Sequence, residues 1–130
     1  MAGCWFEDLT EGHAFAHEIR RTVTEADNMW FCNATCNPAA IHIDAEYAKG
    51  TEFGQPLVNS VFTLGLVLGL SVQDTTLGTT IANLGMSDVR FPKPLFQGDS
   101  VKVRTIVRSK RESKSRPNEG IVNFYHEMTN

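Results

Sequence analysis

His42 lies in the string NPAAIHID, residues 37–44, whose polar side chains could bind a water molecule and transfer its proton. Histidine is the side chain whose unperturbed pKa lies closest to neutral, so it can act as a general acid or base. Asn37 precedes it by five residues and the Asp44 carboxylate follows it by two. An amide can orient water but cannot accept its proton, so His42 is the lone base, or Asp44 or a substrate carboxylate shares the work. The string predicts a small, metal-free site.

A buried helix over residues 60–72 is the first element that such a site needs. The run 61–72 is the longest apolar stretch of the chain, yet it is much shorter than the roughly 20 residues that cross a bilayer. Asn59 or Ser60 can cap its N-terminus. Gly65 and Gly69 share one face, where missing side chains permit close packing. We expect this helix to be covered on all sides, because it is apolar all round.

Further elements follow from capping residues and from β-branched composition. Thr24 and the acidic residues after it begin a helix that continues through Thr35, and a short helix runs from Asp44 to Gly50. Strands are expected at 15–23, 81–91, 100–110 and 120–129, with Phe15, Ile19 and Val23 facing inward in the first of them. The order predicts an α+β fold of one domain, residues 1–130, in which a curved antiparallel sheet wraps around the 60–72 helix.

Charge divides the chain unevenly. Residues 1–89 carry three Lys and Arg against eleven Asp and Glu, whereas residues 90–130 carry nine against four. The basic part predicts an anionic partner, although a set of solvated strand faces would have the same composition. The whole chain is acidic, with a net charge of −3, and the basic part lacks interleaved aromatic residues. We therefore expect no nucleic acid partner, and a phosphate-bearing small molecule fits better.

Cysteines and the remaining histidines indicate neither a disulfide framework nor a metal centre. The chain has three cysteines with a C-x3-C pair, which favours free thiols in a reducing compartment. The first ten residues lack the cationic start of a signal peptide. We expect a cytoplasmic protein, or one of a mitochondrial or peroxisomal matrix, with no membrane partner. His13, His17 and His126 lack metal-site spacing, and neither His13 nor His17 has a carboxylate partner in register.

Three motifs together resemble the MaoC-like hydratases, the (R)-specific enoyl-CoA hydratase group of the hot-dog fold, over essentially the whole chain. They are residues 37–44, the string PLVNS at 56–60 and the string FPKPLFQGD at 91–99. Residues 51–54, 75–80 and 111–117 are similar to strings of mesaconyl-CoA and itaconyl-CoA hydratases, which act on branched C5 dicarboxylic acyl-CoAs. The resemblance implies an enzyme, a hydro-lyase that adds water reversibly to a 2-enoyl-CoA thioester without a cofactor. It also implies a homodimer, or a higher homo-oligomer, with active sites at the subunit interface.

The resemblance also assigns roles to individual residues. His42 matches the catalytic histidine of the family, while Asn37 stands where the family has an acid and would orient the water. The Ser60 amide matches the donor that stabilises the enolate oxygen, a task suited to a helix N-terminus, and Asn59 precedes it. Asn59 and Ser60 could equally be caps alone, and Asp44 is the expected N-cap of the helix after it.

Coenzyme A carries phosphates, and the cluster Arg111, Lys114 and Arg116 is the best cationic candidate to bind them, unless it is a solvated turn. Arg90 could pair with a second carboxylate on a dicarboxylic substrate or form a plain surface salt bridge. Relatives continue past 120–129 with one more strand, so we expect a clipped chain, a covering partner or an altered register at this edge.

Two other functions remain open. An acyl-CoA thioesterase of the same fold would usually place an Asp or Glu on or near the central helix, and residues 59–72 contain neither. A non-catalytic acyl-CoA-binding or protein-binding module is favoured by Asn37 and by the short C-terminus.

Overall fold

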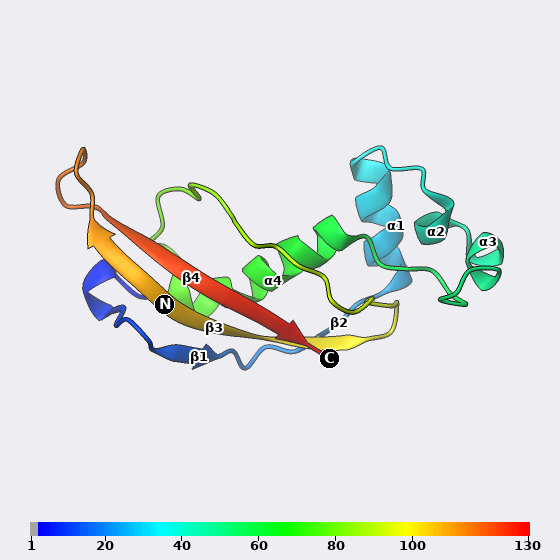
Figure 1. Cartoon of the computed structure of the whole chain (residues 1–130), viewed down its shortest axis with the longest axis horizontal. Coiled ribbons are helices and arrows are strands. Elements are labelled where there is room, and N and C mark those ends of the chain that lie inside the picture. The colour runs from blue at the N-terminus through cyan, green and yellow to red at the C-terminus, as the bar shows by residue number, and fades with distance from the viewer. Residues whose placement is uncertain (1–2) are drawn as a thin grey trace. The chain divides into compact units, whose positions relative to one another are not determined.

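A computed structural model describes residues 3–130 and shows an α+β order of elements, as expected (Figure 1). The chain forms two compact units, one made of residues up to 20, 67–85 and 102–129, and one made of residues 21–66 and 86–101 with residue 130. The elements in chain order are η1 (Phe6–Asp8), β1 (Ala14–Ala16), β2 (Arg21–Thr22), α1 (Glu25–Ala34), α2 (Ala40–Ile43), α3 (Ala45–Lys49), α4 (Ser60–Thr75), β3 (Ser100–Glu112) and β4 (Gly120–Thr129).

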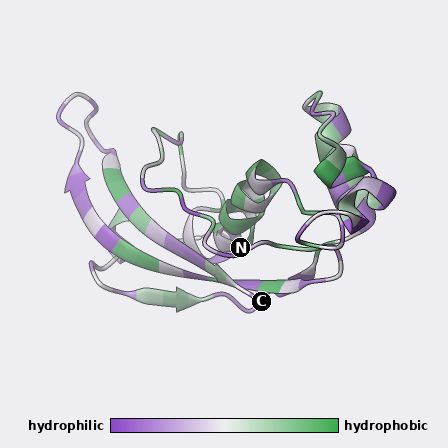
Figure 2. Cartoon of the chain, turned by 45° about the vertical axis from the view of Figure 1, so that its right-hand side comes forward, coloured by the Kyte–Doolittle hydropathy of each residue, from purple (hydrophilic) through white to green (hydrophobic). Residues whose placement is uncertain are grey.

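The first unit is built on an antiparallel sheet in which β3 lies between β1 and β4. The predicted alternation along β3 is confirmed, because Val103, Thr105 and Val107 are buried while Lys102 and Arg104 are exposed. Figure 2 shows this alternation as bands of opposite hydropathy along the strands. Each valine that leaves water on this face contributes roughly 1.5–3 kcal/mol. The sheet therefore offers one apolar face, and the C-terminal half of α4 lies along it (Figure 1).

The second unit contains α1, α2, α3 and the first turns of α4, and its local signals were predicted well. Thr24 caps α1 by accepting a hydrogen bond from the Asp27 backbone amide at 3.1 Å, and Asp27 also binds Arg21 through two hydrogen bonds of 2.7 and 2.9 Å. The Asp44 carboxylate accepts from the Tyr47 amide at 3.0 Å and begins α3. Both helices form where a short polar side chain satisfies otherwise unpaired helix amides.

Two strand predictions are wrong in part. Residues 81–91 form no strand: they make no backbone–backbone hydrogen bond with a described residue, and Ile81, Leu84 and Met86 are exposed. β-branched composition cannot make a strand without a neighbouring backbone to receive its hydrogen bonds. The predicted strand 15–23 is interrupted after β1 and resumes at β2, so Ile19 in the gap is 45% exposed rather than inward-facing.

The helix α4 differs from the prediction in its length and its surroundings. It ends at Thr75, three residues later than expected, and within the added turn the buried hydroxyls of Ser71 and Thr75 donate to carbonyl oxygens of the preceding turn. A Cβ atom built on Gly65 or on Gly69 would meet nothing within 4 Å among residues 3–130. The close packing predicted for these glycines is therefore absent from this structure, and their side of the helix is open.

Candidate active site

His42 is fixed in orientation by one short hydrogen bond. It lies on the single turn α2, where it is half-buried, and its Nδ1 atom lies 2.6 Å from the Leu57 carbonyl oxygen. A carbonyl oxygen can only accept, so Nδ1 carries the proton and Nε2 keeps its lone pair in the neutral ring. Nε2 has no hydrogen-bond partner among residues 3–130. The ring is therefore set up as a proton acceptor at Nε2.

Asn28 ties the backbone on both sides of His42 together. Its side chain is fully buried on α1, and its Nδ2 atom donates to the carbonyl oxygens of His42 and Leu57, both at 3.1 Å. Its Oδ1 atom accepts from the Asn59 backbone amide at 3.0 Å. One amide group thus joins the histidine turn to the residues that lead into α4. No sequence motif pointed to it, although a polar residue at a buried helix position is an unusual feature.

The N-terminus of α4 presents a free backbone donor. Asn59 is buried, and its Oδ1 atom accepts from the Val61 amide at 2.9 Å, so Asn59 is a helix cap, as one reading of the sequence held. The Ser60 amide donates to no described residue, and Ser60 is exposed. A free amide at a helix start favours negative charge on a bound oxygen.

A pocket of about 230 Å³ opens beside this helix start. Its wall is mainly apolar and is formed by Phe53, Leu57, Val58, Ser60, Thr63, Phe91, Pro92, Lys93, Pro94 and Leu95. The residue Leu57, whose carbonyl oxygen holds His42, belongs to this wall. Leu57 therefore links the His42 ring to the wall that Ser60 also lines, while His42 itself is not one of the lining residues.

The motif at 91–99 forms one side of the pocket because backbone pairing holds it there. The Val58 amide donates to the Leu95 carbonyl at 2.9 Å, and Leu57 forms an antiparallel bridge with Phe96. The Asp99 carboxylate then accepts from the Phe96 amide at 2.9 Å and closes a turn. Gly98 in that turn has a φ of 95°, which is accessible mainly to glycine. The glycine and aspartate of the motif therefore shape the turn.

Two predicted site residues are engaged in local turns. The Asn37 Oδ1 atom accepts from the Ala39 amide at 3.0 Å, and the Nδ2 group makes no hydrogen bond with a described residue. Asp44 caps α3, as predicted, and is exposed. Neither side chain forms a hydrogen bond to the His42 ring in this structure.

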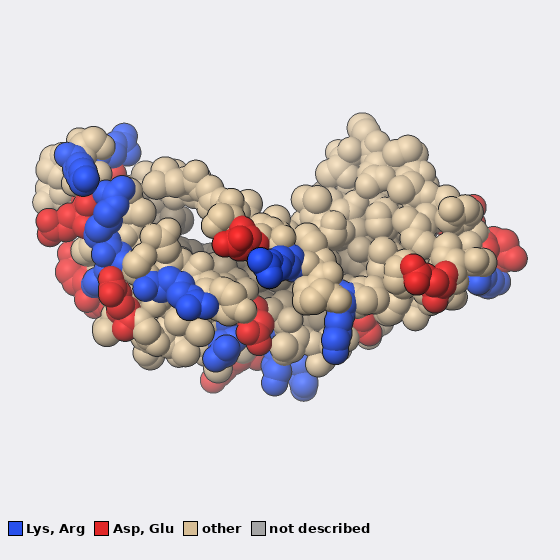
Figure 3. All heavy atoms as spheres, in the orientation of Figure 1, with Lys and Arg blue, Asp and Glu red and all other residues tan. Residues whose placement is uncertain are grey.

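The predicted phosphate-binding cluster belongs to the first unit, at the turn between β3 and β4. All three side chains, Arg111, Lys114 and Arg116, are exposed, and Arg116 lies 3.4 Å from Glu119. Lys and Arg side chains gather over this hairpin with acidic residues among them (Figure 3). The second unit brings together His42, Asn59 and Ser60, and the cationic cluster is not part of it.

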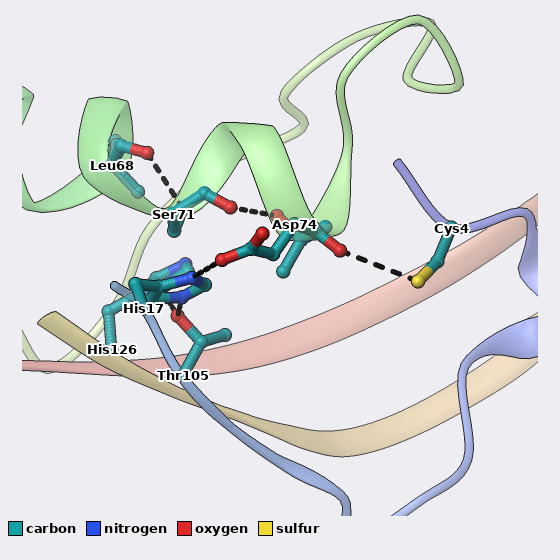
Figure 4. A network of polar contacts seen from close by, with 8 residues as sticks. Cys4, His17, Leu68, Ser71, Asp74, Thr105 and His126 are labelled. Carbon is teal, nitrogen blue, oxygen red and sulfur yellow. Dashed lines mark hydrogen bonds and ion pairs between the residues drawn. The ribbon is translucent and has the colours of Figure 1, made fainter. Parts of the chain in front are cut away.

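A second group of titratable side chains lies in the first unit, on the sheet face below α4 (Figure 4). The His17 Nδ1 atom is 2.7 Å from the Asp74 carboxylate, and its Nε2 atom is 2.7 Å from the Thr105 hydroxyl, which in turn lies 2.8 Å from Nδ1 of His126. The prediction that His17 has no carboxylate partner is therefore wrong. Asp74 lies 57 positions away in the chain, beyond any local pattern.

The single proton of the Thr105 hydroxyl links the two imidazole rings. If the Thr105 hydroxyl donates to Nε2 of His17, its oxygen must accept from a protonated Nδ1 of His126. If it donates to Nδ1 of His126 instead, its oxygen must accept from a protonated Nε2 of His17. Burial, followed by the nearby His17, lowers the pKa of His126. The folded protein therefore favours a neutral His126.

This lowered pKa makes stability depend on pH in a defined direction. Unfolding returns His126 to an ordinary pKa of about 6.5, so the unfolded chain binds more protons as the pH falls through that value. The contribution of His126 is complete above about pH 6.5 and is lost toward its lower folded pKa. Urea unfolding at about pH 7.5 and about pH 5.5 should show a larger loss of unfolding free energy in the wild type than in His126→Gln. Equal losses would contradict this.

Comparisons with known proteins agree on one family. The model of the MaoC like domain matches residues 8–127. This chain belongs to the MaoC-like domain family. Protein MaoC of Klebsiella aerogenes is 33% identical to this chain over 106 residues, which cover 82% of this chain and 31% of that protein. A mesaconyl-CoA hydratase of Cereibacter sphaeroides is 29% identical over 114 residues, which cover 88% of this chain and 33% of that protein. The chain therefore spans about a third of the length of these MaoC-like relatives.

Solved structures of the family share the fold. A MaoC domain protein dehydratase from Chloroflexus aurantiacus matches with a TM-score of 0.88 at 26% identity, over 97% of this chain and 35% of that chain. The antiparallel sheet with its central helix agrees with this MaoC-like, hot-dog architecture, so the expected fold is confirmed. Among residues 3–130, no helix combines the length and the apolar content that crossing a membrane requires.

Proposed function

We propose that this MaoC-like chain forms a hydratase site that adds water reversibly across the double bond of a 2-enoyl-CoA thioester. The observation that carries the proposal is the hydrogen bond from His42 to Leu57, which leaves Nε2 free to take a proton. General base catalysis needs such an acceptor next to the attacking water. The Asn37 amide orients the water, His42 removes a proton from it as its oxygen bonds to the β-carbon, and His42 then delivers a proton to the α-carbon of the enolate. In the reverse reaction His42 removes the α-proton and donates a proton to the leaving hydroxyl group.

The start of α4 supplies the second requirement of the reaction. Addition of water to the β-carbon moves negative charge onto the thioester oxygen, and the free Ser60 amide stabilises this charge. The pocket beside Ser60 accepts the acyl chain. Coenzyme A enters as part of the substrate.

The finer proposal concerns the substrate and the assembly. A branched C5 dicarboxylic acyl-CoA of the mesaconyl-CoA or itaconyl-CoA type is supported by the similarity to a protein named mesaconyl-CoA hydratase. A homodimer is proposed on the resemblance alone, and a cytoplasmic location is proposed on the free cysteines.

An acyl-CoA thioesterase is the second candidate, because α4 extends beyond its predicted end and includes an acidic residue, Asp74. The extension to Thr75 brings Asp74 into the helix, where its half-exposed carboxylate binds His17 and lines a pocket of about 620 Å³. A carboxylate in such a place could activate water for thioester hydrolysis. The absence of an acid from residues 59–72 therefore no longer argues against this function.

Two assays in parallel separate these candidates. Loss of enoyl-thioester absorbance is followed with crotonyl-CoA, mesaconyl-CoA and itaconyl-CoA, and release of the coenzyme A thiol is followed in the same samples with a thiol reagent. The hydratase proposal expects the absorbance to fall without thiol release. Equal rates of absorbance loss and thiol release would indicate the thioesterase instead. Turnover that appears only in Asn37→Asp would indicate a binding module.

A further inference from the structure

The pocket beside Ser60 contains a single charged residue, Lys93, in a wall that is otherwise apolar apart from two hydroxyl groups. The Lys93 ammonium group takes part in no ion pair or hydrogen bond with any of residues 3–130. Of the other cations of this unit, Arg21 binds Asp27 and Lys49 binds Glu46. Arg90 also has no ion pair or side-chain hydrogen bond with a described residue, but it does not line the pocket. An unpaired ammonium group next to an apolar wall is a favourable partner for a carboxylate on a bound molecule.

The backbone holds Lys93 in this position. Pro92 and Pro94 flank it, and proline restricts both its own φ and the conformation of the preceding residue. The hydrogen bond between the Val58 amide and the Leu95 carbonyl oxygen fixes the segment two residues after Lys93. Lys93 is exposed, which fits a long side chain whose stem follows the apolar wall while its charged end remains at the mouth of the pocket.

The size of the pocket limits what can reach Lys93. At about 230 Å³ it is smaller than the roughly 300–1,000 Å³ of sites for drug-sized ligands. A thioester whose oxygen is bound at the Ser60 amide would direct its acyl chain along Leu57 and Phe53 into this space. A short acyl chain fits there, and a carboxylate at its far end would meet a cation instead of an apolar wall.

We propose that Lys93 is a specificity-determining residue, which binds the free carboxylate of a short dicarboxylic enoyl-CoA and selects it over the monocarboxylic analogue. This inference rests on the proposed hydratase function and names the substrate class of that site. It replaces Arg90 as the partner of the second carboxylate, because Arg90, which is exposed like Lys93, does not line the pocket.

The test compares kcat/KM for mesaconyl-CoA and crotonyl-CoA in the wild type, Lys93→Met, Lys93→Arg and Lys93→Glu. Lys93→Met should lower kcat/KM for mesaconyl-CoA by about fivefold to twentyfold, since water competes for an exposed charge, and leave that for crotonyl-CoA within about twofold. Lys93→Arg should retain most of the preference, and Lys93→Glu should lower it further by charge repulsion.

Controls distinguish this inference from its alternatives. Lys49→Met removes an exposed cation outside the pocket and should leave the preference unchanged. An equal loss for both thioesters in Lys93→Met would overturn the inference, since Lys93 would then bind the coenzyme A part. Loss of the preference in Arg90→Met but not in Lys93→Met would overturn it as well.

Failure of the proposed function can be recognised separately. A wild type that hydrates neither thioester would contradict the hydratase function. The inference about Lys93 would then be decided by equilibrium binding of the two thioesters. It is supported if Lys93→Met weakens only the binding of mesaconyl-CoA, and it is overturned if binding of both changes equally or not at all.

Discussion

Replacing His42 with alanine is expected to lower kcat for enoyl-CoA hydration by about 100- to 10,000-fold, the range that a positioned general acid or base contributes. KM should change by less than about threefold, because the ring acts on the water and the acyl chain lies in the adjacent pocket. Initial rates over a range of crotonyl-CoA concentrations measure both constants. The effect is large because no other described residue places a free imidazole nitrogen at this turn.

His13→Ala is the matched control for this variant. His13 is exposed and belongs to the first unit, where its ring packs edge-on against Phe15. Its removal should leave kcat within about twofold, and both variants should keep the circular dichroism spectrum of the wild type. If His42→Ala kept more than about half of the wild-type kcat, His42 could not be the base.

Replacing Asn28 with alanine is expected to lower the free energy of unfolding by about 2–4 kcal/mol. The change leaves the His42 carbonyl oxygen and the Asn59 amide without the partner that they have in the wild type, and the Leu57 carbonyl oxygen keeps only the His42 ring. Each buried polar group left unsatisfied costs about 1–3 kcal/mol, and relaxation recovers part of the sum. Urea unfolding followed by circular dichroism measures the difference.

Two further variants separate the role of Asn28 in positioning from its role in stability. Asn33→Ala changes an exposed asparagine of the same helix and should alter the unfolding free energy by less than about 0.5 kcal/mol. Asn28→Asp keeps an acceptor for Asn59 but turns an oxygen toward two carbonyl groups, so kcat should fall in the protein that remains folded. An Asn28→Ala protein as stable as the wild type would contradict this account of the buried amide.

The elements that sequence predicted correctly are those that local chemistry determines. Thr24 begins α1 and Asp44 begins α3 because each side chain satisfies an amide three residues ahead. The alternation along β3 follows from one buried face. In contrast, residues 81–91 have strand-like composition but no backbone hydrogen-bond partner among the described residues, and α4 continues to Thr75, where the Thr75 hydroxyl is buried and bonded to the Ser71 carbonyl oxygen. Such features depend on partners that the local sequence does not contain.

The candidate site divides in the same way. The string at 37–44 pointed to His42, and the apolar run after Asn59 pointed to a helix N-terminus, so both were predicted. The partners that orient them were missed: Asn28 acts through bonds to residues 14, 29 and 31 positions away. The contribution of Lys93 to the pocket was also missed, because it requires the pairing of Leu95 with Val58. Sequence spacing pointed to the residue that we propose as the reacting group, and tertiary contacts define its surroundings.

The function that we propose for this chain is the addition of water to an enoyl thioester without breaking the thioester bond. Mass spectrometry of the products formed from crotonyl-CoA by the wild type and by His42→Ala tests it most directly. We expect the wild type to yield an intact acyl-CoA that is heavier by one water molecule, and His42→Ala to yield almost none of it in the same time. Free coenzyme A together with the unsaturated acid, or an unchanged thioester with the wild type, would contradict it.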